Sequence, residues 1–399
     1  MPRAEPFRIA FSDGALSDLR ERLARTRFAP DHHNEDWRYG VPTSELRNWV
    51  EAWLRFDWRA AEGRINRFEH YRVEIDGTLI HFLHRRGRGP RPAPLILTHG
   101  WPWTFWDWHA VIDPLADPAA HGGDAADAFD VIVPSLPGFG FSTPLTATDM
   151  TATRTAGLWV KLMCDVLGYD RFAAAGGDMG NIITAQLGHA HADRLFGIHL
   201  LGAIPLAPAK PIPPGPQGPW TWDWGFDRPA SPPADPVLAA SPTSPPTTPS
   251  SHRVVHTTEP QTLAAALHDS PAGMMAWLLK ARRHWSDSRG DVRNAFSEEF
   301  LLTTFSLYWL TESLATSVRA YRAGADHPWR PSHDRWPVVE TPTGITFFEY
   351  DQTSRSRFWA ADYYNLIRTS YQPRGGHFSP AEVPQTVVAE IRETFRRLR

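Results

Sequence analysis

The stretch from Phe172 to Gly188 constrains the fold more than any other part of the chain. A short apolar run is followed by Gly176, Asp178 and Gly180, spaced as Gly-x-Asp-x-Gly, and then by a helical pattern. Glycines at this spacing let a strand and a helix pass close together, with the residue between them at the apex of a sharp turn. The pattern therefore predicts a strand–turn–helix unit that presents the Asp178 side chain.

A carboxylate at that apex limits the reactions that a nucleophile at this position could carry out. It can attack an sp³ carbon of a strained epoxide or an alkyl halide and form an ester. The ester keeps a carbonyl group, so a base-activated water can hydrolyse it and restore the acid. A serine would leave an ether that water does not cleave. The alternative is a glycine-rich turn in which Asp178 only caps the following helix.

Apolar runs typical of buried strands alternate with helical patterns along the chain. Strands are predicted at 94–98, 130–134, around Ala173, at 197–201 and at 343–348, and helices at 153–167 and 180–192. This alternation favours an α/β fold, with a mostly parallel central sheet and helices on both faces.

The composition divides the chain into four parts. Residues 1–90 read as a helical preface and a first hairpin, and residues 91–203 and 337–399 read as two halves of one α/β core. Between the halves, residues 204–336 begin with a Pro-rich excursion, in which proline blocks regular structure, and continue with helical patterns. An insertion at this place in the fold predicts a helical lid.

Composition and charge exclude several classes of function. The chain has 41 basic and 44 acidic residues, which argues against nucleic acid or an anionic membrane as its main partner. A single cysteine, no apolar signal-peptide run and no membrane-length segment predict a cytoplasmic protein. No zinc-type spacing, P-loop or dinucleotide fingerprint is present, so we expect no metal and no cofactor.

Two further loops carry residues that suit an ester mechanism. His99-Gly-Trp101-Pro102 follows a predicted strand, so the backbone N–H of Trp101, beside that of Met179, could face a developing oxyanion. Arg374-Gly-Gly-His377 lies before the last helix, where a histidine could act as general base. The alternatives are a simple strand-end turn and a solvated loop histidine.

An acid that orients the histidine should follow the late strand. Asp351 and Glu349 both do so, and either could stabilise the charged form of His377; Asp362 is a further candidate. The order of strand, nucleophile, acid and histidine is that of an α/β-hydrolase.

Together these stretches resemble the microsomal-type epoxide hydrolases, which are α/β-hydrolases with an N-terminal epoxide-hydrolase domain. The resemblance runs from about Pro6 to the C-terminal helix and fails only in the Pro-rich excursion. Its landmarks are Arg38-Tyr-Gly-Val41, His99-Gly-Trp-Pro102, Pro137-Gly-Phe-Gly-Phe-Ser142, Gly176-Gly-Asp-Met-Gly180, Pro260-Gln-Thr-Leu, Asp269-Ser-Pro-Ala-Gly, Tyr308-Trp-Leu-Thr and Pro373-Arg-Gly-Gly-His-Phe378.

The resemblance implies that an epoxide is hydrolysed to a vicinal diol without a cofactor. Asp178 would be the nucleophile, His377 the base and Asp351 the acid. The backbone of Trp101 and Met179 would form the oxyanion hole.

The family also uses two lid tyrosines to hold and protonate the epoxide oxygen. Tyr321 matches one of them, whereas His252 stands at the position of the other. A phenol with a pKa near 10 donates a proton without readily ionising, whereas an imidazole with a pKa near 6.5 is largely neutral at pH 7. Tyr321 could act alone, His252 could donate as an imidazolium, or Tyr308 or a tryptophan N–H could substitute.

Two other departures concern the pocket. Met179 stands where the family usually has tryptophan, which would reshape the pocket floor. Trp103 and Trp106, where the family has smaller residues, could form an aromatic wall or pack in the core. The 18 tryptophans favour a bulky or aromatic small-molecule epoxide as substrate.

Two rival functions share these residues. A haloalkane dehalogenase would keep the Asp and His but hold a halide with Trp or Asn groups. A non-catalytic binding protein could use the same fold without a second lid tyrosine. A homodimer is compatible with the sequence.

Overall fold

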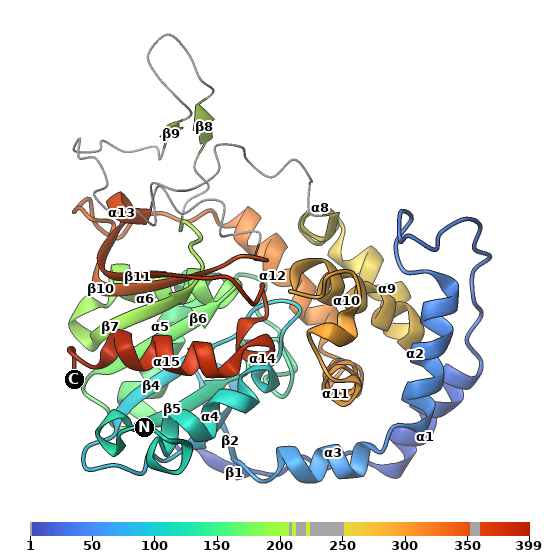
Figure 1. Ribbon diagram of the computed structural model, residues 1–399, viewed down its shortest axis with the longest axis horizontal. Coiled ribbons are helices and arrows are strands. Elements are labelled where there is room, and N and C mark those ends of the chain that lie inside the picture. The colour runs from blue at the N-terminus through green and yellow to red at the C-terminus, as the bar shows by residue number, and fades with distance from the viewer. Residues whose placement is uncertain (1, 207–209, 213–220, 224–250, 352–359) are drawn as a thin grey trace.

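A nine-stranded sheet forms the centre of the computed structural model, which describes residues 2–206, 210–212, 221–223, 251–351 and 360–399. Its strand order is β1-β2-β3-β5-β4-β6-β7-β10-β11 (Figure 1). The first three strands and the β3–β5 pair are antiparallel, and all pairs from β5 to β11 are parallel. The strands are β1 (Glu5–Phe7), β2 (Glu69–Ile75), β3 (Thr78–Arg85), β4 (Ala93–Thr98), β5 (Phe129–Pro134), β6 (Phe172–Gly177), β7 (Leu195–Leu201), β10 (Val339–Phe348) and β11 (Tyr364–Gln372).

Helices cover both faces of the parallel part of the sheet. The chain moves from β4 through α4 to β5 on one side of it in the sheet, and from β6 through α6 to β7 on the opposite side. Because both crossovers are right-handed, α4 and α6 lie on opposite faces of the sheet. α15 packs beside α4, and α5 beside α6. The core helices are α4 (His109–Ala116), α5 (Ala152–Val160), α6 (Met179–Ala190), α13 (Ala360–Tyr363), α14 (Ser379–Glu382) and α15 (Pro384–Phe395). The predicted α/β-hydrolase architecture is thereby confirmed.

Helices between β7 and β10, here called the inserted helices, pack to one side of the sheet, as Figure 1 shows. They are α8 (Ser251–Thr258), α9 (Pro260–Asp269), α10 (Pro271–Trp285), α11 (Glu298–Leu310) and α12 (Leu314–Asp326). Part of the Pro-rich excursion forms a short antiparallel pair, β8 (Lys210–Ile212) with β9 (Thr221–Asp223), and its remaining residues up to 250 fall mostly outside the described ranges.

The N-terminal helices follow the outer side of the inserted helices (Figure 1). They are α1 (Asp13–Ala24), α2 (Thr43–Arg55) and α3 (Trp58–Ile65). Trp53 donates its indole N–H to the Ser306 hydroxyl at 2.9 Å, and Arg22 pairs with Asp269 at 2.8 Å. The N-terminal helices are therefore joined by specific contacts to α9 and α11.

Local structure differs from the sequence-based prediction in three places. β11 was not predicted, because this edge strand mixes apolar residues with polar ones and has no continuous buried apolar run. The helix predicted at 153–167 is α5 continued by a π-helical turn at Lys161–Val166. Among the helical patterns predicted for the later part of residues 204–336, α11 and α12 are separate helices, because Glu312 between them has a positive φ of 54°. In the part of the chain that is described, no helix is both long and apolar enough to cross a bilayer.

A buried ion pair connects the inserted helices to the sheet side of the molecule. Arg282, on α10, contacts Asp107 with guanidinium–carboxylate distances of 2.6 and 3.1 Å, and donates to the carbonyl of Pro102 at 2.9 Å. Both side chains have an exposed fraction of 0%. The pair thus fixes α10 against the loop that follows β4.

We expect Arg282→Met to lower the free energy of unfolding by about 3–5 kcal/mol, because it leaves the Asp107 carboxylate buried without its partner. Urea and thermal unfolding followed by circular dichroism measure the loss. The exposed pair Arg322–Asp326 provides a matched control, and Arg322→Met should cost less than about 1 kcal/mol. The double variant Arg282→Met, Asp107→Asn should recover part of the loss; no recovery would contradict the assignment.

Candidate active site

Asp178 occupies a strained turn between β6 and α6. Its φ of 55° and ψ of −123° lie in a region that non-glycine residues rarely adopt. A Cβ on Gly176 would lie 2.3 Å from the carbonyl oxygen of Gly180, and one on Gly180 would lie 2.1 Å from that of Thr98. Only glycine fits at these two positions, so the predicted Gly-x-Asp-x-Gly turn is present with Asp178 at its apex.

Backbone N–H groups surround the Asp178 carboxylate. The N–H of Trp101 donates to Asp178 Oδ1 at 2.7 Å, and the N–H of Met179 also hydrogen bonds the carboxylate. The Trp101 loop is held by His99, which accepts from the Leu136 N–H at Nε2, 3.0 Å away. The structure thus brings together the two N–H groups that the sequence predicted for an oxyanion hole.

His377 lies between two carboxylates. Its Nε2 is 3.0 Å from Asp178 Oδ2, and its Nδ1 is 3.2 Å from Asp351 Oδ1. Of the two acids that follow the late strand, Asp351 is buried and faces the imidazole, whereas Glu349 is exposed. The backbone N–H of His377 donates to the carbonyl of Trp285 at 2.7 Å, which attaches the histidine loop to the end of α10.

The two carboxylates favour the charged form of the imidazole. Burial alone lowers the pKa of His377, but the charge of Asp351 and the hydrogen bonds to both carboxylates outweigh it and raise the pKa to about 10. Burial raises the pKa of Asp178, but its bonds to His377, Trp101 and Met179 lower it overall. Near neutral pH the site therefore holds an imidazolium between two carboxylates.

Glu382 is a supporting residue that the sequence analysis missed. Its carboxylate accepts the backbone N–H of Phe378 at 2.8 Å and that of Asp287 at 2.7 Å, so it joins the histidine loop to the segment after α10. Burial raises the pKa of Glu382 to about 7. Its only sequence signal is the position of an acid five residues after the histidine.

An aromatic cluster from the inserted helices packs against the Trp101 indole. The ring of Tyr321, on α12, lies 6.2 Å from that of Trp101 between centroids, and the ring of His252, on α8, lies 5.2 Å away. His256, one turn further along α8, lies 4.6 Å away and was not singled out from the sequence. Burial raises the pKa of Tyr321 well above its ordinary value, and the charge of Asp178 acts in the same direction.

The tryptophans predicted as a pocket wall lie in different surroundings. Trp103 is fully buried, and its ring lies edge-on to that of His377 at 5.8 Å. Its carbonyl accepts the Tyr308 hydroxyl at 2.8 Å, so this tyrosine already has a partner. Trp106 instead stacks on His109 at 4.7 Å.

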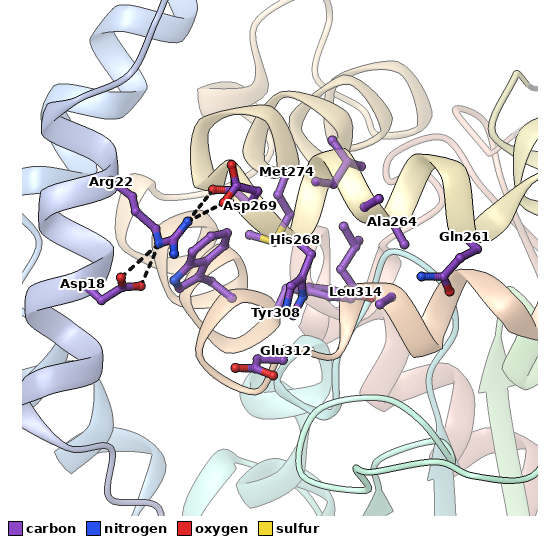
Figure 2. A pocket seen from close by; sticks show the side chains of 14 residues that line it. Asp18, Arg22, Gln261, Ala264, His268, Asp269, Met274, Tyr308, Glu312 and Leu314 are labelled. Atoms are coloured by element: carbon purple, nitrogen blue, oxygen red, sulfur yellow. Dashed lines mark hydrogen bonds and ion pairs between the residues drawn. The ribbon is translucent and has the colours of Figure 1, made fainter.

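A surface cavity of about 370 Å³ lies between α1 and the inserted helices, as Figure 2 shows. Tyr308 and Met274 contribute to its lining, and Arg22 bridges Asp18 and Asp269 at its edge. Neither Asp178 nor His377 lines it, so this cavity is separate from the carboxylate site. In the described ranges, no group of three or more His, Cys, Asp or Glu side chains is arranged to hold a metal ion.

Two family models match the chain. A family model described as "Epoxide hydrolase N terminus" matches residues 4–108, and one described as "alpha/beta hydrolase fold" matches residues 93–290. A Stigmatella aurantiaca protein assigned by name to the epoxide hydrolases is 40% identical over 99% of this chain and 85% of its own length.

More distant relatives cover the chain equally well. Epoxide hydrolase 1 of Oryctolagus cuniculus is 30% identical over 97% of this chain and 87% of its own length. The solved structure of Aspergillus niger epoxide hydrolase has a TM-score of 0.79 and 25% identity, and covers 99% of this chain and 96% of its own.

The raised pKa of His377 predicts how stability depends on pH. An imidazole in the unfolded chain has a pKa of about 6.5, so the folded state holds an extra proton between about pH 6.5 and about pH 10. The stabilisation is complete below this window and is lost as the pH rises through it. We expect the free energy of unfolding of the unmodified chain to fall relative to that of His377→Gln by up to about 1.4 kcal/mol per pH unit. Urea unfolding across the window measures both, and identical pH slopes would contradict the imidazolium.

Proposed function

The chain belongs to the epoxide hydrolase family of α/β-hydrolases, and we propose that it adds water to an epoxide through a covalent ester on Asp178, giving a vicinal diol. The observation that carries this proposal is the contact of one carboxylate with both an oxyanion-hole N–H and an imidazole. Asp178 Oδ1 accepts from Trp101 at 2.7 Å, and Oδ2 lies 3.0 Å from His377. These are the groups that forming and hydrolysing an alkyl ester require.

The first half of the reaction forms the ester. An oxygen of Asp178 attacks a ring carbon of the epoxide, the carbon–oxygen bond of the ring breaks, and its electron pair moves onto the ring oxygen. Tyr321 donates its hydroxyl proton to that oxygen. Its raised pKa keeps the hydroxyl protonated in the resting enzyme, so the donor is present whenever substrate binds.

The second half hydrolyses the ester, and the charges of the site determine its timing. Alkylation removes the negative charge of Asp178, one of the groups that raise the pKa of His377. The imidazole then releases its proton to solvent more readily, and it accepts a proton from the water that attacks the ester carbonyl. Asp351 stabilises the imidazolium that forms, and the N–H groups of Trp101 and Met179 stabilise the oxyanion. When the tetrahedral intermediate collapses, the bond to the leaving diol oxygen breaks, that oxygen takes the hydroxyl proton of the intermediate, and Asp178 is restored as a carboxylate. Solvent returns a proton to Tyr321.

The inserted helices act in this proposal as the lid over Asp178. They supply Tyr321 from α12, and the rings of His252 and Trp285 lie next to Trp101. Aromatic groups on this side favour a bulky or aromatic epoxide, because ring faces bury large apolar surfaces.

We expect intact-protein mass spectrometry of His377→Gln to detect the ester after mixing with an aryl epoxide. Without the base the second half stops, so the mass should increase by that of the whole epoxide, and peptide mapping should place the adduct on Asp178. The double variant Asp178→Ala, His377→Gln is the control and should remain unmodified. No adduct from a range of epoxides, with alkylation and halide release from an alkyl halide, would instead identify a dehalogenase.

Tyr321→Phe tests the donor to the ring oxygen. We expect kcat for epoxide hydrolysis to fall by about 10²-fold or more, because general acid catalysis by a positioned side chain is typically of this size. Steady-state diol formation measures the change, with folding checked by circular dichroism. Unchanged kcat would remove Tyr321 from the mechanism.

A further inference from the structure

Two histidines on α8 lie one helical turn apart next to Tyr321. The ring centroid of His252 is 5.5 Å from that of Tyr321, and the ring centroid of His256 is 5.0 Å from it. Both histidine rings therefore contact the ring of the tyrosine. Their surroundings differ, and this difference shows which of them offers a hydrogen bond.

The tautomer of His256 is determined by Trp277. The indole N–H of Trp277, on α10, donates to His256 Nε2 at 3.1 Å. A nitrogen that accepts this bond carries no proton, and a neutral imidazole keeps one proton on its other nitrogen. Burial lowers the pKa of His256 to about 3, so the ring is neutral at ordinary pH. Nδ1 of His256 is therefore an N–H donor.

In the described part of the chain, this donor has no partner. His256 has an exposed fraction of 0%, and its Nδ1 has no hydrogen-bond partner among the described residues. Buried donors are nearly always satisfied, so an unpaired one next to the ring of Tyr321 indicates a group that can serve a ligand. The neighbouring Trp101 is the residue whose backbone N–H binds Asp178.

His252 offers less for the same role. Its ring lies flat on the Trp101 indole, with an angle of 11° between the planes. Burial lowers the pKa of His252 to about 4, although the charge of Asp178 acts in the opposite direction, so at ordinary pH the ring is not an imidazolium donor. Unlike His256, it has no described N–H group that determines its tautomer.

We propose that His256 Nδ1–H is the second donor to the epoxide oxygen, beside the hydroxyl of Tyr321. The inference rests on the proposed function and adds a residue to it. As Asp178 attacks and the ring carbon–oxygen bond breaks, the electron pair moves onto the oxygen. Tyr321 transfers its proton there, and His256 donates a hydrogen bond while keeping its own proton. Tyr321 later regains its proton from solvent, as in the proposed mechanism.

A second hydrogen-bond donor would help to stabilise the negative charge that develops on the epoxide oxygen. The raised pKa of Tyr321 makes its proton harder to release while the oxygen gains charge. A neutral imidazole N–H is a much weaker acid than a phenol, so it stabilises that charge without becoming an alternative proton source.

The test isolates ring opening from ester hydrolysis. In the His377→Gln background, rapid-quench mass spectrometry gives the rate of ester formation at saturating aryl epoxide and the epoxide concentration for half-saturation. We expect His256→Phe to lower the saturating rate by about 10²-fold, the usual loss for one oxyanion donor. Half-saturation should change little, because the bond strengthens as charge develops.

Matched variants separate donation from packing. His256→Asn keeps an N–H near the position of Nδ1 and should retain most of the rate. His268→Phe, at an exposed histidine of α9, should be unchanged. If His256→Phe does not fold by circular dichroism, His256→Leu takes its place.

Three results would overturn the inference while leaving the ester mechanism in place. They are an unchanged rate in His256→Phe, an equal loss in His256→Phe and His256→Asn, and a larger loss in His252→Phe than in His256→Phe. Absence of any ester in the His377→Gln parent is a different outcome, because it overturns the proposed function and this inference with it.

Discussion

The site depends on how closely β4, β6 and the start of α6 approach one another. Backbone atoms of Thr98 and Gly180 lie where a Cβ would need to be, so the chain has no room for a side chain at the two glycines. Asp178 between them is forced to a φ of 55°. That conformation aims the carboxylate at the N–H of Trp101 on one side and the imidazole of His377 on the other. Orientation of the nucleophile is therefore a property of the sheet.

In the proposed mechanism, the charge of the site changes between the two halves of the reaction. The resting imidazolium is stabilised by Asp178 and Asp351, so in that form it cannot accept a proton. Conversion of Asp178 to a neutral ester weakens this stabilisation. In the proposed mechanism the general base is thus produced by the first chemical step, and the order of the two halves is built into the electrostatics.

The sequence could predict those parts of the fold and the site that depend on local steric requirements, but not those that depend on contacts between distant segments. The Asp178 turn was predictable because its steric requirement is local and leaves glycines at fixed spacing. Choosing Asp351 over Glu349 was not, since both follow β10 and only the fold shows which one faces His377. His256 was missed because its role depends on the hydrogen bond from Trp277, which lies on another helix. β11 was missed because an edge strand lacks the continuous apolar run of a central one.

Helix α10 has a different relation to the site from that of α8 and α12. Arg282 binds the loop that carries Trp101, and the Trp285 carbonyl binds the backbone of His377, so one helix positions both halves of the ester machinery. α8 and α12 meet the site mainly through rings. Divergence in substrate preference can therefore accumulate at the positions of α8 and α12 other than His256 and Tyr321, because side chains there can change without moving the base. Substitutions along α10 would instead lower turnover, because they would displace the Trp101 loop or His377. Among the inserted helices, α10 is therefore expected to tolerate the least change.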